Sequence, residues 1–264
     1  MTARSSLKTA FLIAAAGAIV LTAGCGGRAK SRDTAYVARD VDTLYAAAQE
    51  RLNTGRTRQA AALFDEVERQ HPYSPWARRA QLMSAFSYYA ARDYNKAIQS
   101  AQRFLSIHPG NKDAPYAYYL IAICYYEQIS DVTRDQKATE QAKQALTDVM
   151  RRYPGTTYAR DAQLKIDLVN DHLAGKEMTI GRSYERSGKW LAATLRFRNV
   201  VDNFQTTSHT PEALYRLVEG YLSLGIPEEA QKAAAVLEEN YPRSSWYARA
   251  YKLMAKHAPE NVAA

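Results

Sequence analysis

Apolar positions after residue 38 fall in segments of helical length, and these segments end in similar short sequence motifs. Four of the segments end in a proline: Arg69-Gln70-His71-Pro72, Ser106-Ile107-His108-Pro109, Arg151-Arg152-Tyr153-Pro154 and Glu239-Asn240-Tyr241-Pro242. A proline ends a helix because its ring clashes with the preceding turn and because it has no N–H to donate. Strand signals are nearly absent, since glycine is scarce and no Asn-Gly or Asp-Gly turn occurs. The pattern predicts an all-α fold.

An alanine stands twelve residues before each of these four prolines. A fifth unit lacks the proline but carries an alanine and a bulky residue, Phe197, in the same places. The five alanines are spaced by 37, 45, 51 and 37 residues: Ala60, Ala97, Ala142, Ala193 and Ala230. We expect each alanine at a close crossing of two helices, where a larger side chain would push the backbones apart.

This spacing of alanines, bulky residues and prolines resembles that of the tetratricopeptide repeat, a helix-turn-helix unit of about 34 residues. The resemblance implies a helical solenoid of five repeats, at roughly 41–73, 78–110, 113–155, 174–206 and 211–243, with a capping helix at 244–257. Gly55, Gly188 and Gly225 then fall at turns between paired helices, where glycine tolerates positive φ. Ser74-Pro75, Asp113-Ala114-Pro115 and Thr210-Pro211 are predicted to begin helices, because each offers a capping side chain beside a first-turn proline.

Two spacings exceed the repeat length, and each predicts an additional segment. The spacing of 45 contains residues 130–136, a polar stretch that we expect to form an exposed loop. The spacing of 51 contains residues 158–175, an additional helical stretch that we expect to run on into the fourth repeat. Residues 39–173 are therefore interpreted as an N-terminal group of repeats 1–3, and residues 174–258 as repeats 4–5 with the cap.

The first 24 residues have the pattern of a secretory signal. Arg4 and Lys8 precede an apolar stretch, residues 10–23, of roughly 21 Å as a helix, which is too short for a ~30 Å bilayer core. The residues ending in Cys25 resemble a bacterial lipobox, with Thr22 at the position that is usually leucine. This resemblance implies a lipidated Cys25 and a tether over residues 25–38, and Gly26 in place of aspartate favours the outer membrane. An ordinary signal peptide with an incidental cysteine is the alternative.

Charge and cysteine content exclude several classes of protein. The formal net charge of +8 falls to +6 without Arg4 and Lys8, and no run of five basic residues occurs, which disfavours nucleic-acid binding. Two cysteines exclude a disulfide scaffold and a cysteine-rich zinc module. Cys124 lies in an apolar helix and is expected to be a buried, inert thiol.

No motif of a phosphate-binding loop, a zinc protease or a serine hydrolase is present, so neither an enzyme, a metal nor a cofactor is expected. Tyrosine is abundant, with 19 residues against six phenylalanines. Tyrosine suits half-buried surfaces, where the ring packs and the hydroxyl stays in water. We expect the tyrosines outside the repeat core, near Tyr73 and along residues 116–126, to mark a surface for partners.

Four sequence segments resemble those of the BamD (ComL) family, the lipoproteins of the β-barrel assembly machinery. They are residues 44–52 followed by Gly55 and Gln59-Ala60; residues 71–77; residues 125–131 with Arg134-Asp135-Gln136; and residues 171–177. The resemblance implies an outer-membrane lipoprotein that faces the periplasm and has no enzymatic activity. It further implies binding to the periplasmic domains of the barrel subunit, to accessory lipoproteins and to unfolded outer-membrane proteins. A general periplasmic repeat adaptor that organises cell-wall or division proteins is the alternative.

The same resemblance nominates partner-binding residues in the fourth repeat. The segment 189–197 matches the family segment whose arginine pairs with an acidic residue of the barrel subunit, which places that arginine at Arg196. Arg198 is the alternative register, and Trp190 lies in the same segment and is a further candidate. Guanidinium suits this role because its planar fork binds a carboxylate bidentately. The competing interpretation is a solvated arginine on a helix surface.

Aromatic residues of the N-terminal repeats are candidates for a peptide groove, because outer-membrane proteins end in aromatic residues. The candidates are Tyr73, Trp76, Tyr88 and Tyr89. Packing in the repeat core is the alternative, and it is favoured for Tyr88. In the inserted loop, Asp131, Arg134 and Asp135 are candidate contact residues.

Overall fold

The computed structural model describes residues 39–132 and 134–261. Within these residues the chain forms eleven α-helices, one short 3₁₀-helix and no strand. The helices are α2 (Val41–Asn53), α3 (Thr57–Gln70), α4 (Pro75–Ala90), α5 (Tyr94–Ile107), α6 (Ala114–Tyr126), α7 (Lys137–Arg152), α8 (Thr157–Arg186), α9 (Trp190–Asn203), α10 (Thr210–Ser223), α11 (Pro227–Asn240), α12 (Ser245–His257) and η1 (Pro259–Asn261). The predicted signal peptide, the predicted tether and Cys25 lie outside the described residues.

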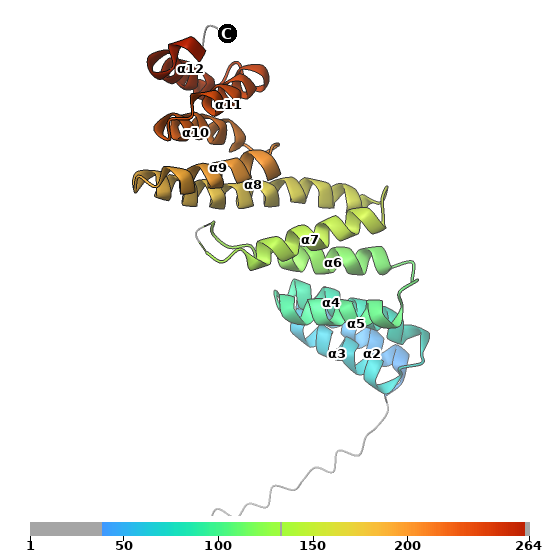
Figure 1. The fold of residues 1–264 in the computed structure, drawn as a ribbon. Coiled ribbons are helices and arrows are strands. Elements are labelled where there is room, and N and C mark those ends of the chain that lie inside the picture. Colours follow the sequence, from blue (N-terminus) through green and yellow to red (C-terminus); the bar gives the residue numbers. More distant parts are fainter. Residues whose placement is uncertain (1–38, 133, 262–264) are drawn as a thin grey trace, which may run out of the picture. The chain divides into compact units, whose positions relative to one another are not determined.

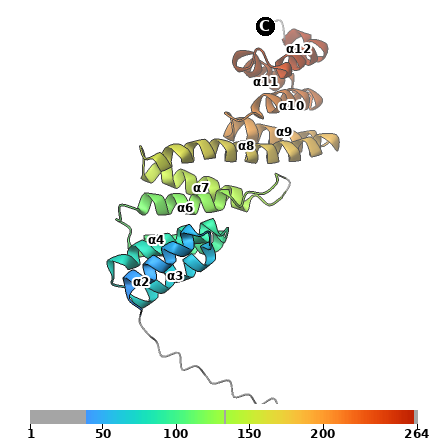
Figure 2. The same ribbon diagram turned by 180° about the vertical axis from the view of Figure 1, so that it is seen from behind.

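The helices form five antiparallel pairs followed by a last helix, α12 (Figure 1). Each helix from α2 to α12 packs against the next one along the chain, and α2/α4, α4/α6, α6/α8 and α10/α12 also touch. The view from behind shows the same succession of pairs (Figure 2). By their contacts, residues Asp40–Ala264 form one compact unit. The predicted all-α repeat fold with a C-terminal cap is confirmed.

The residues that predicted the repeats occupy the expected places. The five alanines are 0–1% exposed, and bulky residues such as Phe64 and Phe197 are buried beside them. Gly55, Gly188 and Gly225 have φ of 74°, 70° and 74°. Arg92 stands at the corresponding turn of the second pair with φ 59°, so this turn places a side chain where the other turns use glycine.

Helix α8 has 30 residues and its partner α9 has 14. The predicted additional stretch therefore continues without a break into the first helix of the fourth repeat. The boundary between residues 173 and 174 falls inside this helix. None of the helices in the described part of the chain combines the length and the apolarity that a bilayer span requires.

Two of the three predicted capping side chains do not cap their helices in the structure. Ser74 caps α4 as predicted, accepting a hydrogen bond from Trp76 N at 2.9 Å. Asp113 precedes α6 without a side-chain capping bond. Thr210 is the first residue of α10 rather than its cap, because its hydroxyl donates to the carbonyl oxygens of Phe204 and Gln205, both at 3.0 Å.

Candidate partner-binding surfaces

Helix α9 has a buried face and an exposed face. Ala193, Phe197 and Val200 are at most 1% exposed and pack into the C-terminal core. On the other side, Leu191 and Leu195 are 64% and 60% exposed, one helical turn apart. The exposed leucines give α9 an apolar face that nothing in the described chain covers.

Arg196, nominated as the partner-binding arginine, has a carboxylate partner within the chain. Its Nη1 lies 3.2 Å from Oε2 of Glu177 on α8, and the two side chains are 42% and 17% exposed. Both hydrogen bonds to Glu177 use Nη1, whereas a guanidinium carries five N–H donors. Arg196 therefore retains the capacity to bind a second carboxylate from the exposed side.

The two other residues nominated on α9 lie apart from that pair. Arg198 is 53% exposed, with Nη2 at 3.6 Å from Oε2 of Glu229 on α11. Its guanidinium also lies 6.0 Å from the ring centre of Tyr221. Trp190, the first residue of α9, is half-buried.

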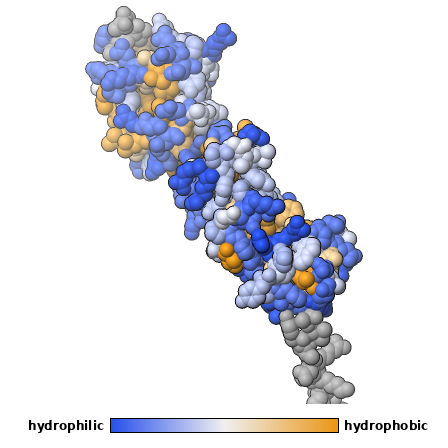
Figure 3. Space-filling view, turned by 90° about the vertical axis from the view of Figure 1, so that its right-hand side faces the viewer, coloured by the Kyte–Doolittle hydropathy of each residue, from blue (hydrophilic) through white to orange (hydrophobic). Residues whose placement is uncertain are grey.

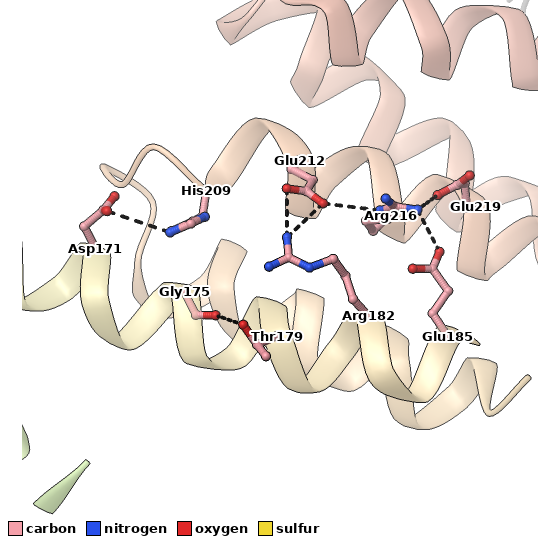
Figure 4. A network of polar contacts seen from close by, with 9 residues as sticks. All are labelled: Asp171, Gly175, Thr179, Arg182, Glu185, His209, Glu212, Arg216 and Glu219. Carbon is pink, nitrogen blue, oxygen red and sulfur yellow. Dashed lines mark hydrogen bonds and ion pairs between the residues drawn. The ribbon is translucent and has the colours of Figure 1, made fainter. Parts of the chain in front are cut away.

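A network of charged side chains joins the first helices of repeats four and five, α8 and α10 (Figure 4). Arg182 Nη1 lies 3.1 Å from both carboxylate oxygens of Glu212. Arg216 reaches Glu185 at 3.2 Å, Glu219 at 2.9 Å and Glu212 at 3.5 Å. The sequence does not reveal this network, because the partners that join the two helices are 30 and 31 residues apart and only tertiary packing brings them together.

Burial and charge act against each other within this network. Burial and the neighbouring Glu219 raise the pKa of Glu185, and together they outweigh Arg216, which lowers it. Burial alone would lower the pKa of Arg216, but the surrounding glutamates outweigh it and raise that pKa. Arg216 therefore stays charged, and it neutralises carboxylates that would otherwise repel one another.

The inserted loop contacts the start of this junction. Asp131, Arg134 and Asp135 are exposed, as predicted for loop residues. The carbonyl oxygen of Arg134 accepts hydrogen bonds from Gln136 Nε2 at 2.9 Å and from Lys176 Nζ at 3.3 Å.

Gly175 on α8 permits a close approach at this point. A Cβ there would lie 3.1 Å from His209 Nε2 and 3.6 Å from Val132 Cγ1. The loop, α8 and the start of α10 therefore meet at Gly175.

The four aromatic candidates of the N-terminal repeats do not line one groove. Tyr73 is 99% exposed on the turn before α4. The Trp76 ring packs against Tyr45, with the ring centres 4.5 Å apart, and lines a cavity of about 540 Å³ with residues 78–79 and 110–113. Tyr88 and Tyr89 are not among the residues that line this cavity.

Tyr88 and Tyr89 pack instead against the core of the second repeat. The Tyr88 hydroxyl donates a hydrogen bond of 2.7 Å to Oδ2 of Asp65 on α3. Burial, together with this carboxylate, raises the pKa of Tyr88 to about 12. The Tyr89 ring packs beside Phe86 and Tyr94, at 6.5 Å and 6.1 Å between ring centres.

Comparison with known proteins places this structure in a family. The model of the YfiO family, described as an outer membrane lipoprotein, matches residues 37–237. A Caulobacter vibrioides protein named outer membrane protein assembly factor BamD is 54% identical over 247 residues, which cover 94% of this chain and 81% of that protein. The Rickettsia prowazekii protein of the same name is 45% identical over 232 residues, covering 88% of this chain and 92% of that protein.

A solved structure, a thermophilic tetratricopeptide-repeat protein of Thermus thermophilus, matches with a TM-score of 0.37 and 21% identity, over 81% of this chain and 99% of that one. The family resemblance of the four sequence segments is confirmed by the family model and by the two relatives. The chain belongs to the YfiO family of outer membrane lipoproteins, and it is similar to its two BamD relatives along most of their length.

Proposed function

We propose that this chain is a BamD-type assembly factor of the outer membrane. In this role it is a non-enzymatic scaffold, anchored by lipid at Cys25 and facing the periplasm. It binds the periplasmic domains of the barrel-forming subunit and accessory lipoproteins, and it helps to deliver and insert unfolded outer-membrane proteins. The observation that carries the proposal is 54% identity to a named assembly factor over 94% of this chain. A general periplasmic adaptor does not account for identity of this extent.

The barrel subunit binds, in this proposal, to α9. Leu191 and Leu195 supply an exposed apolar surface, and Arg196 lies at its border. Both hydrogen bonds of Arg196 to Glu177 use Nη1, so its other N–H groups can bind a partner. Arg198 and Trp190 lie on the same helix and extend the surface. Apolar contacts would supply binding energy, while the arginine would select an acidic partner and fix its register.

Co-purification of the barrel subunit with the Arg196→Glu variant tests this site. That variant also places two glutamates together, at positions 177 and 196, so misfolding must be separated from lost recognition. The double variant Arg196→Glu/Glu177→Arg restores an internal ion pair in the reversed order. If Arg196 itself contacts the partner, both variants lose the barrel subunit while their helicity is unchanged.

Recovery of binding in the double variant would contradict the Arg196 assignment. Arg243→Glu, the same charge change at an exposed residue after α11, serves as the control and should bind normally. Arg198→Glu tests the alternative register in the same assay.

Substrate peptides are proposed to bind near Trp76. Its half-buried ring borders the cavity on one side, and an aromatic residue at the end of a substrate has a ring to pack against there. Tyr88 and Tyr89 lie in the last turn of α4, away from this cavity, and would not touch the peptide. A Trp76→Ala variant should lose crosslinking to a peptide with a C-terminal aromatic residue, whereas Tyr89→Phe should retain it.

The lipid anchor has its own test. Cys25→Ala should leave the chain unprocessed or released from the membrane, and acylation of that variant would contradict the anchor. A pull-down from detergent extracts of the envelope separates the two candidate functions. A large β-barrel protein in the pull-down supports the assembly factor, and a cell-wall hydrolase supports the adaptor.

A further inference from the structure

The turns that join one helix pair to the next carry exposed cations on a single edge of repeats one to three. Arg78 and Arg79 lie in the first turns of α4, and Lys112 lies in the loop before α6. Together these three side chains border the cavity beside Trp76. Farther along the same edge, Arg152 ends α7 and Arg160 lies in the first turn of α8. We call these five residues the basic edge.

Within the described residues, no ion pair is formed by any member of the basic edge. Arg79 and Arg152 lie instead over aromatic rings, at 5.6 Å from the ring centre of Trp76 and 5.1 Å from that of Tyr118. Asp113 is the carboxylate among the cavity-lining residues, against three cations. The edge is therefore short of internal counter-charges.

Tyr73 adds an aromatic side chain at the same edge. It is 99% exposed and makes the turn between α3 and α4, so its ring stands free of the core. Figure 3 looks at the side of the molecule that carries these turns, which over the N-terminal repeats is mostly hydrophilic with small hydrophobic spots. Tyrosine and arginine in this combination are typical of surfaces that meet the headgroup region of a bilayer.

Charge alone does not distinguish this edge, because Arg56, Arg58 and Arg92 are exposed at the turns on the opposite edge. The position of the start of the folded body does distinguish it. Helix α2 begins at Val41, and its Tyr45 ring lies 4.5 Å from the ring of Trp76 at the cavity. The opposite edge is one helix length away, about 20 Å for 13 residues.

We propose that the basic edge binds the headgroups of anionic phospholipids and holds the N-terminal repeats against the membrane surface. This rests on the proposed lipid anchor for its context. The 14 residues from Cys25 to residue 38 span at most about 50 Å, so an anchored chain keeps the edge at high local concentration near the bilayer. Tyr73 is then assigned to the lipid interface, and Trp76 stays with the peptide cavity.

Vesicle co-sedimentation tests the edge without the anchor. Residues 26–264 contain the whole compact unit and cannot carry the acyl group of Cys25. This fragment should bind vesicles of phosphatidylcholine with phosphatidylglycerol and should not bind phosphatidylcholine alone. Binding should weaken as salt rises from about 0.01 M to about 0.15 M, because the Debye length falls from ~30 Å to ~8 Å.

A charge-reversed variant with a matched control locates the binding. Arg78→Glu/Arg79→Glu/Lys112→Glu should lower the partition coefficient at least about tenfold. The control Arg56→Glu/Arg58→Glu/Arg92→Glu has the same net charge, and it should keep most of the binding. Circular dichroism and the thermal midpoint of both variants verify that they are folded.

Three results would overturn the proposal. They are equal sedimentation with the two kinds of vesicle, an equal loss of binding in both triple variants, and binding to the anionic vesicles that does not weaken as the salt concentration rises. Because the fragment lacks Cys25, failure of the lipid anchor leaves this result unaffected, and failure here leaves the anchor unaffected.

Discussion

Gly181 on α8 allows a close approach of Phe197 on α9 in the fourth repeat. A Cβ at this position would lie 2.5 Å from Cε1 and 2.9 Å from Cδ1 and Cζ of Phe197. Phe197 is 1% exposed, so its ring is enclosed by the side chains of the core. The Gly181→Ala substitution therefore forces the two helices apart or forces the ring off its rotamer.

Helix propensity and overpacking act in opposite directions on the stability of the Gly181→Ala variant. In an exposed helix, alanine stabilises by about 1 kcal/mol relative to glycine. Overpacking a filled core costs about 1–3 kcal/mol and sometimes more. With contacts this short we expect the overpacking cost to win, for a net loss of about 1–2 kcal/mol. For a chain of this size each kcal/mol lowers the thermal midpoint by roughly 2–4 °C.

Thermal and urea unfolding followed by circular dichroism measure the loss in Gly181→Ala. The control is Gly110→Ala, which meets nothing within 4 Å and should be nearly neutral. Phe197→Leu removes ring atoms from the clash, so the double variant should be more stable than the sum of the single effects. Stabilisation by Gly181→Ala, or strict additivity with Phe197→Leu, would refute the close packing of α8 and α9.

Three further predictions follow from polar and buried groups. Arg216→Ala should destabilise by about 2–3 kcal/mol in urea unfolding, because three glutamates lose their shared cation, and a neutral result would contradict the network. Tyr88→Phe should cost about 1–2 kcal/mol through the lost bond to Asp65. The pKa of Tyr88 is raised by burial to about 12, so its contribution to stability should be lost as pH rises from 10 to 12, and an alkaline titration of the variant should show less loss than the wild type. Burial raises the pKa of the Cys124 thiol to about 12, so a disulfide reagent at pH 8 should modify it only after denaturant is added, and fast labelling of the native protein would contradict its burial.

The sequence alone determined the repeat fold, because the signals that specify it are local. A proline ends a helix, a glycine makes a left-handed turn, and an alanine marks a crossing, and each acts within a few residues of its own position. Because these signals are local, the sequence also predicts that the additional stretch 158–175 runs on into the fourth repeat, as it does in the 30-residue helix α8. It also explains the error at Thr210, whose hydroxyl had a capping position by sequence but found the carbonyl oxygens of Phe204 and Gln205 in space.

Only the tertiary structure decided which polar groups meet. Arg196 and Glu177 are 19 residues apart, Tyr88 and Asp65 are 23 apart, and Arg216 and Glu185 are 31 apart. No spacing rule reaches that far, because each contact depends on how successive helices rotate and cross when they pack. For the same reason the four aromatic candidates of the N-terminal repeats looked alike in sequence, whereas packing buried parts of three of them and left Tyr73 almost wholly in solvent.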